Sequence, residues 1–238
     1  LKLIPFPFQD ISYYAAPFIV AQAPLASTTA DFWIMIKEQQ IELIVSLLGD
    51  AETGPDVYWP TEKGRDLALS GLVVSLVSVT VKPHWIERLI SIGIPEKRDS
   101  RVLLHLQFTS WPGSLFPTNP EPFATFVTEV TNLFLQQRST AHPVVVHCSS
   151  GIGRSGLVCL LVSAILEVTS NPVAVPDLVG LAVKLGAWRR NMLRDREHLK
   201  FAYEAFLAYM KQVLAQGEWR ASLAHFLYLV LFFIVFFF

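Results

Sequence analysis

The sequence predicts an α/β fold in which a central, twisted, mixed β-sheet is flanked by helices. Strand-like segments rich in Val, Ile and Leu dominate the first half of the chain, whereas apolar segments of helical length dominate the second half. The 238 residues are enough for one domain with a sizeable hydrophobic core. We therefore expect strands and helices to pack in layers around a single sheet.

The individual elements follow in order along the chain. A helix is expected at residues 28–40, because a Ser/Thr cap precedes an acidic first turn, and a strand is expected at residues 43–47. Three longer strand-like segments and one short β-branched run supply the other expected strands, which are residues 71–82, 85–94, 101–108 and 143–146. The other expected helices are residues 123–135, 154–168, 176–191 and 197–214.

One stretch, from His147 to Gly156, places a thiol, backbone amides and a guanidinium around a single point. Its Gly-rich turn lies between an expected strand and an expected helix. Unpaired N–H groups and the positive end of the helix dipole there favour a dianion such as a phosphoryl group. The same field lowers the pKa of Cys148 and favours a thiolate at neutral pH. A thiolate beside a bound phosphoryl group predicts displacement through phosphocysteine.

The rest of this stretch completes a phosphate site. Arg154 carries a planar fork of donors that suits bidentate contact with two phosphoryl oxygens. The glycines allow a tight turn whose amides face the ligand. The predicted phosphate-binding residues are Ser149, Ser150, Gly151, Ile152, Gly153 and Arg154. The alternative interpretation, a buried structural cysteine beside an ordinary turn, is disfavoured because the strand, the histidine, the glycines and the helix all agree.

Through this stretch the chain resembles the protein tyrosine phosphatases, whose signature is His-Cys, five residues, Arg, Ser or Thr, and Gly. The resemblance covers most of the sequence, residues 18–214, and it implies the cysteine-based phosphatase fold. Four further motifs stand in the family's order and favour the tyrosine-specific, non-receptor branch. They are Gln22-Ala23-Pro24-Leu25, Asp31-Phe32-Trp33, Tyr58-Trp59-Pro60 and Trp111-Pro112.

The resemblance also implies roles and partners. It makes Cys148, Arg154 and Ser155 catalytic, with His147 and Trp111 in support. The paired serines after Cys148 look most like the His-domain members of the family, whose longer parent protein carries endosomal-sorting modules. We therefore expect a phosphotyrosine protein or peptide as partner, endosomal-sorting partners, a cytoplasmic or endosomal location, and neither a cofactor nor a metal.

Several positions depart from the family's pattern. Relatives carry Asp after Trp-Pro, on a mobile loop that protonates the leaving tyrosine, and here that position is Gly113; Glu121, eight residues on, is not expected to replace it. Arg194 stands in place of a Gln that orients the hydrolytic water, and His198, at a second Gln position, could bind water. Ser150 replaces Ala, and its hydroxyl is expected to pack against the loop and compete for hydrogen bonds. Both chemical steps are expected to be slow.

The two ends of the chain also depart from the family. The resemblance implies a phosphotyrosine-recognition loop that the chain begins too late to contain, so we expect an N-terminally truncated domain of residues 1–217. Residues 218–238 form an unmatched apolar tail. Residues 223–238 fall just short of the minimum of about 17 residues for a membrane span. A tail anchor and translated non-coding sequence remain alternatives, and we favour the second.

Composition limits the partners and the compartment. A net charge of −1 gives no global basic field for nucleic acid. A basic cluster in the second half could steer an anionic substrate, although such a run is more often a solvated helix face. Its members are Arg189, Arg190, Arg194, Arg196 and Lys200. The two cysteines, Cys148 and Cys159, do not form a disulfide framework and favour a reducing compartment.

Three hypotheses about function follow. The first is a phosphatase of phosphotyrosine with much reduced turnover. The second is an inactive module that holds a phosphotyrosine peptide or acts as a scaffold, because the phosphate site is kept while the acid and the water-orienting Gln are lost. The third is a product that does not fold alone, because the front wall of the pocket is missing and the tail is unmatched.

Overall fold

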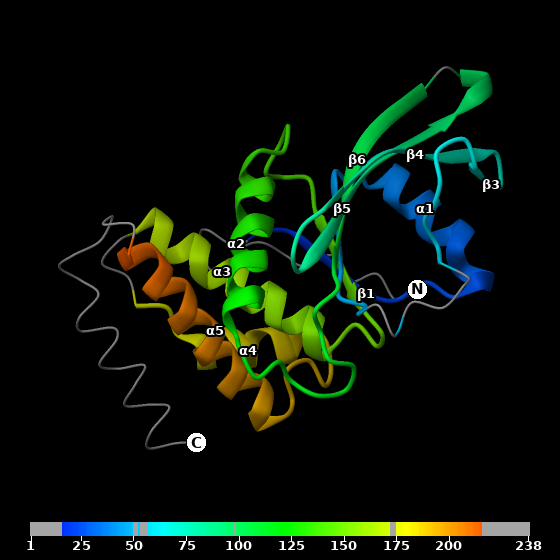
Figure 1. The fold of residues 1–238 in the computed structure, drawn as a ribbon. Helices are drawn as coiled ribbons and strands as arrows, with labels where there is room; N and C mark the ends of the chain where they lie inside the picture. Colours follow the sequence, from blue (N-terminus) through cyan, green and yellow to red (C-terminus); the bar gives the residue numbers. More distant parts are fainter. Residues whose placement is uncertain (1–15, 50–51, 53–56, 98, 172–174, 216–238) are drawn as a thin grey trace.

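The computed structural model describes residues 16–49, 52, 57–97, 99–171 and 175–215. At its centre is a seven-stranded mixed sheet with the strand order β1-β7-β2-β6-β5-β4-β3 (Figure 1). The predicted fold class is therefore confirmed. The expected truncation, the domain boundary at residue 217 and the apolar tail lie outside the described residues and stay predictions.

The sheet combines a parallel half with an antiparallel half. Neighbouring strands from β1 to β6 in the sheet order run parallel, and those from β6 to β3 run antiparallel. The strands are β1 (Phe18–Gln22), β2 (Leu43–Ser46), β3 (Leu67–Leu69), β4 (Leu72–Val81), β5 (Trp85–Ile94), β6 (Asp99–Phe108) and β7 (Val144–Cys148). The five predicted strands are confirmed to within two residues at each end, whereas β1 and β3 were not predicted.

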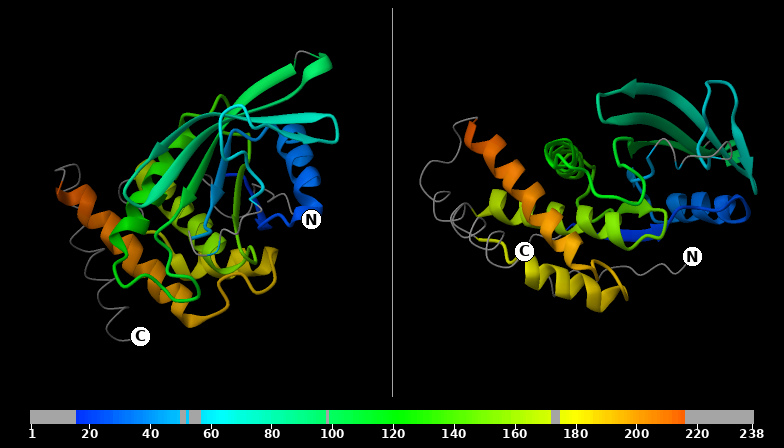
Figure 2. Two further views of the ribbon diagram at one scale, coloured as in Figure 1. Left: turned by 45° about the vertical axis from the view of Figure 1, so that its right-hand side comes forward. Right: turned by 60° about the horizontal axis from the view of Figure 1, so that its bottom comes forward.

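Helices cover both faces of the sheet (Figures 1 and 2). On one face lies α1 (Thr29–Glu38), and on the other lie α2 (Glu121–Leu135), α3 (Gly153–Ser170), α4 (Leu178–Trp188) and α5 (Arg196–Ala215). The five predicted helices are confirmed to within three residues at each end. By length and composition α3 could cross a membrane, but 72% of it is buried within the described part of the chain, as in a core helix.

The strand β7 lies between β1 and β2 and is buried on both faces, which explains its unbroken β-branched sequence. Val144 and Val146 pack in the core shared with α2 to α5, and Val145 packs in the core shared with α1. The parallel strands β1, β7, β2 and β6 end at the same edge, where Gln22 pairs with Cys148. Ligand sites of such sheets lie outside the carboxyl ends of the strands.

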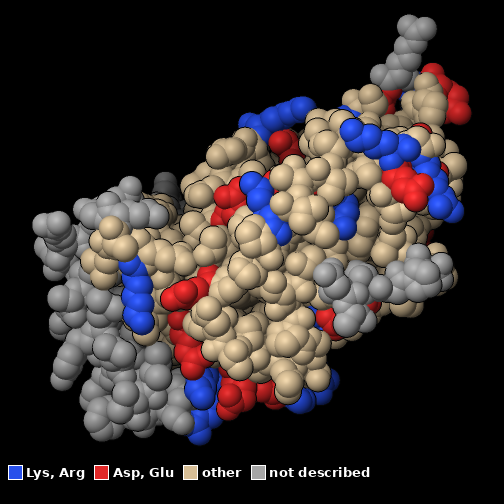
Figure 3. Space-filling view, in the orientation of Figure 1, with Lys and Arg blue, Asp and Glu red and all other residues tan. Residues whose placement is uncertain are grey.

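The opposite face is anchored by α1. Its side chains Phe32, Trp33 and Ile36 are fully buried, and the Trp33 indole N–H donates to the Tyr58 carbonyl at 2.7 Å. This contact fixes the segment that contains Tyr58 beneath the sheet edge where β7 ends. Acidic and basic side chains are interspersed over the described part of the face in Figure 3. That distribution supplies no extended basic surface on this face.

Candidate active site

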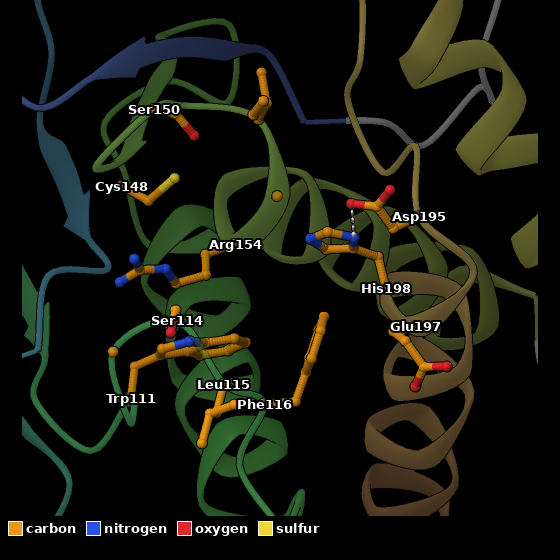
Figure 4. A pocket seen from close by; sticks show the side chains of 13 residues that line it. Trp111, Ser114, Leu115, Phe116, Cys148, Ser150, Arg154, Asp195, Glu197 and His198 are labelled. Carbon is orange, nitrogen blue, oxygen red and sulfur yellow. Dashed lines mark ion pairs between the residues drawn. The ribbon is translucent and has the colours of Figure 1, made fainter.

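Cys148, the last residue of β7, lines a pocket of about 460 Å³ at the carboxyl edge of the sheet (Figure 4). Three segments form the pocket: the turn between β7 and α3 with the first residues of α3, residues 111–116, and residues 195–198 at the start of α5. Of the six predicted phosphate-binding residues, four line it, namely Ser150, Ile152, Gly153 and Arg154. The structure thus brings the predicted thiol, guanidinium and turn together.

The Cys148 thiol is buried, with only 2% of the residue exposed. Burial raises the pKa of this thiol, but hydrogen bonds from the Ser155 hydroxyl and from the amides of Ser155, Gly151 and Ile152 outweigh it, and the net pKa is lowered. The Gly151 amide lies 3.2 Å from Sγ. The buried Ser155 hydroxyl has no oxygen or nitrogen partner in the described part of the chain, which leaves the sulfur as its acceptor. The site therefore favours a thiolate.

The backbone of the turn depends on Gly151. Its φ is +69°, and a Cβ at this position would lie 2.2 Å from the carbonyl oxygen of Ala21 in β1. Only glycine fits this close approach. The expected packing of the Ser150 hydroxyl against the loop is wrong, because Ser150 is exposed and lines the pocket instead.

Arg154 is held by a partner that sequence reasoning missed. Its guanidinium makes two hydrogen bonds to the Glu52 carboxylate, of 2.5 and 2.7 Å, and a third of 2.7 Å to the Leu47 carbonyl. The hydrogen bond from Arg154 lowers the pKa of Glu52 against the opposing effect of burial. The guanidinium also lies over Trp111, 5.7 Å from the ring centroid. These contacts aim the guanidinium between Cys148 and Trp111 (Figure 4).

His147 lies behind the site in a buried chain of hydrogen bonds. The Arg88 guanidinium lies 3.4 Å from His105 Nδ1, His105 Nε2 lies 2.8 Å from the Tyr58 hydroxyl, and that hydroxyl lies 2.6 Å from His147 Nε2. Because Arg88 can only donate, the chain runs from Arg88 through His105 and Tyr58 to His147. Burial lowers the pKa of His147 to about 3 and, with the charge of Arg88, lowers that of His105 well below its usual value. His147 therefore supports the strand end as a neutral acceptor.

The two buried neutral histidines, His105 and His147, predict that the stability of the fold depends on pH. In the unfolded chain each imidazole binds a proton near pH 6.5, whereas the folded protein keeps His147 neutral down to about pH 3. The unfolded state therefore binds more protons below pH 6.5, and the free energy of unfolding falls as pH falls. We expect up to about 1.4 kcal/mol per pH unit for each of the two histidines. Urea unfolding between about pH 7 and 5 measures this slope, and a flat profile would contradict the buried neutral pair.

Residues 111–116 form the wall of the pocket that faces Cys148. Trp111 is buried and packs edge-on against Phe116, Phe123 and Phe201. Gly113 has φ +65°, and a Cβ there would meet no atom within 4 Å. This segment has no ionisable side chain. Glu121 is exposed at the start of α2 and does not line the pocket, as the sequence predicted.

The first turn of α5 and the residue before it form another wall of the pocket, and here one prediction needs correction. Arg194 does not line the pocket; its side chain is 69% exposed and lies beside Asp195, with Nε 3.4 Å from the carboxylate. Leu193 has φ +53°, and the backbone turns at this point. His198 does line the pocket, together with Asp195 and Glu197, two residues that sequence reasoning did not select. Their position next to His198, at the start of an expected helix, was the available signal.

This fold, with a thiol of lowered pKa beside a Gly-rich turn and an arginine next to it, is that of a cysteine-dependent phosphatase domain. The model of the protein-tyrosine phosphatase family matches residues 9–208, and the chain belongs to this family. It is 37% identical to tyrosine-protein phosphatase non-receptor type 23 of mouse and of human, over 209 residues and 87% of this chain. It is 30% identical to mouse non-receptor type 5, over 84% of this chain and 36% of that protein.

These comparisons confirm the narrower resemblance, which is to non-receptor type 23. The aligned region amounts to 12% of the mouse type 23 protein and 13% of the human one. The chain therefore spans about an eighth of the length of these relatives. The similarity therefore does not extend to this chain any activity that those proteins have outside the aligned region.

Proposed function

We propose that this domain hydrolyses phosphotyrosine in proteins or peptides through a phosphocysteine intermediate, at a rate well below that of its relatives. The observation that carries the proposal is the buried Cys148 thiol, whose pKa is lowered by the turn and which faces a pocket with Arg154 but no acid at position 113. The nucleophile and the phosphate site are retained, whereas the group that would protonate the leaving phenol is absent from residues 111–116.

In the first step, Cys148 Sγ attacks phosphorus and the bond to the phenolic oxygen breaks. Arg154 and the amides of the turn stabilise the charge on the equatorial oxygens. Because Gly113 supplies no proton, tyrosine leaves as the phenolate, and its conjugate acid has a pKa of about 10. A positioned acid typically contributes about 10²- to 10⁴-fold to such a step. In the second step water attacks phosphorus and releases the Cys148 thiolate, without a glutamine at position 194.

A series of aryl phosphates tests this assignment. We expect the rate of the first step to fall steeply as the pKa of the leaving phenol rises, because the leaving oxygen receives no proton in the transition state. Phosphotyrosine should be among the slowest substrates of the series, and an activated fluorogenic aryl phosphate among the fastest. Equal first-step rates for good and poor leaving groups would contradict the absence of an acid.

The absence of the acid also supports a second candidate function, a module that binds phosphotyrosine without turnover. Arg154 remains aimed at the pocket while Gly113 and Arg194 offer no catalytic group there. This function predicts that a phosphotyrosine peptide binds, that Arg154→Ala abolishes binding, and that no phosphate is released. Binding that is indifferent to phosphorylation would contradict it and favour a plain scaffold.

The family membership supports an intracellular site of action, because the similar proteins are non-receptor types. We place the domain in the cytoplasm, where reducing conditions protect the Cys148 thiolate from oxidation. Similarity to type 23 motivates a second location at endosomes, with endosomal-sorting proteins as partners. Co-sedimentation of the tagged full chain with endosomal membranes measures this, and a purely soluble distribution would remove the endosomal part of the proposal.

A further inference from the structure

The pocket contains an ionisable pair that does not belong to the phosphate-binding turn. His198 stands in the first turn of α5 and lines the pocket, with 18% of its side chain exposed. Its Nδ1 faces the Asp195 carboxylate at 3.8 Å, across the end of the loop that leads into α5. Figure 4 shows Asp195 on the Nδ1 side of the imidazole, so that Nε2 is on the side of Cys148 and Arg154.

Two contacts hold this orientation. A Cβ at Gly153 would lie 2.4 Å from His198 Nε2, so the imidazole approaches the first residue of α3 more closely than any other residue type would allow. Phe116 packs against the ring at 79° with a centroid distance of 5.1 Å. The ring is therefore fixed beside the turn that would hold the phosphoryl group, between Phe116 of one wall and Gly153 at the start of α3.

Among the groups that surround it in the pocket, the His198 imidazole is the one placed to accept a proton. Residues 111–116 carry no ionisable side chain, Arg194 is directed outward, and the Glu197 carboxylate points away from the ring (Figure 4). Arg154 on α3 and the Cys148 thiol at the end of β7 also line the pocket. Arg154 cannot accept a proton, and Cys148 is esterified in the intermediate. The Asp195 carboxylate also lines the pocket, but it lies on the Nδ1 side of the imidazole, away from Cys148 and Arg154 (Figure 4).

From this geometry we infer that His198 is the general base of phosphocysteine hydrolysis, with the Asp195 carboxylate facing its Nδ1. The inference rests on the proposed function and assigns it a proton acceptor. A water oxygen attacks phosphorus, the P–S bond breaks and its electron pair returns to Cys148 as the thiolate. The water proton passes to His198 Nε2 directly or through one further water, and the imidazolium then releases it to solvent. The products are inorganic phosphate and free enzyme.

The state of the imidazole suits this role. Burial lowers the pKa of His198, and the Asp195 carboxylate opposes the shift. The imidazole is therefore neutral near pH 7 and can accept a proton. As pH falls through this lowered pKa the base is lost, so kcat for a substrate whose hydrolysis step is limiting should fall on the acid side. Loss of the Asp195 charge should lower the pKa further and move this acid limb to lower pH.

The test uses the full chain and an activated fluorogenic aryl phosphate in stopped flow, which separates the burst of phenol release from the steady state. For His198→Ala we expect an unchanged burst rate, a steady-state rate lower by about 10²-fold, and no acid limb from this group. His198→Gln, which keeps a polar group that can bind water, should also lose the acid limb. Asp195→Asn should shift the limb to lower pH with a smaller loss of rate.

His142→Gln is the matched control. His142 pairs with Glu42 at the opposite end of β7 from Cys148 and should leave burst, steady state and pH profile unchanged. A wild-type steady-state rate and pH profile in His198→Gln would reduce His198 to a water-positioning residue and overturn the inference. So would a slowed burst in every His198 variant, which would indicate a structural role. A wild-type chain with neither burst nor turnover would overturn the proposed function itself, and the inference with it.

Discussion

Replacing Cys148 with serine is expected to reduce hydrolysis of an activated aryl phosphate to the background rate, a loss on the order of 10⁶-fold if the thiolate is the nucleophile. The turn that lowers the pKa of the thiol cannot ionise a serine hydroxyl to a useful extent at neutral pH. The serine should fit the site, because it is smaller than cysteine and keeps the amide of Gly151 and the hydroxyl of Ser155 within reach. Turnover by the purified full chain at pH 7 measures the effect.

The second cysteine provides the control. Cys159 is buried in α3, and burial raises the pKa of its thiol, so it is not a nucleophile. Cys159→Ala should keep most of the activity, since alanine also fits an apolar core. Activity that survives in Cys148→Ser, or that disappears equally in both variants, would contradict the assignment of the nucleophile. The Cys148→Ser chain should still bind a phosphotyrosine peptide through Arg154.

The second large expected effect is an increase in turnover. Gly113→Asp should raise the turnover of poor leaving groups such as phosphotyrosine by about 10²- to 10⁴-fold, the usual contribution of a positioned acid. The position has room, because a Cβ there meets no atom within 4 Å, and aspartate is among the residues that best tolerate a φ of +65°. Activated aryl phosphates, which need no protonation, should gain little in the burst step.

Gly113→Asn is the matched control, because it has the shape of aspartate without an ionisable proton. It should leave the rate on phosphotyrosine at the wild-type level. Equal gains in the two variants would show that the side chain acts through the conformation of residues 111–116 and not as an acid. No gain in Gly113→Asp, with a stable fold, would show that these residues do not approach the leaving oxygen.

The elements with strong local patterns could be predicted from the sequence. The buried β-branched run of β7 and the alternation in β4 indicated strands, and the long apolar segment of α3 indicated a helix. The short strands β1 and β3 were missed because their few residues carry no distinctive period. Strand β1 depends on a partner more than 100 residues away, since Phe18 pairs with Val144. Such pairing is decided by tertiary packing, which weakens local prediction.

The site also contains residues that the sequence could place and residues that it could not. The turn from Cys148 to Arg154 is contiguous, so the sequence alone could place its groups around one point. Glu52 could not be selected, because it reaches Arg154 from a loop about 100 residues earlier, and the two meet only through the parallel order of β2 and β7. The outward direction of Arg194 was also hidden, since a backbone turn at Leu193 decides it.

Cys148 is expected to carry the phosphoryl group during turnover. The most direct measurement mixes the full chain with an activated aryl phosphate, stops the reaction with acid and maps the phosphorylated peptide by mass spectrometry. We predict one phosphoryl group on Cys148, accumulating because its hydrolysis is slow, and none in Cys148→Ser. Phosphate release by the wild-type chain with no phosphoryl group on Cys148 at any time point would contradict the account.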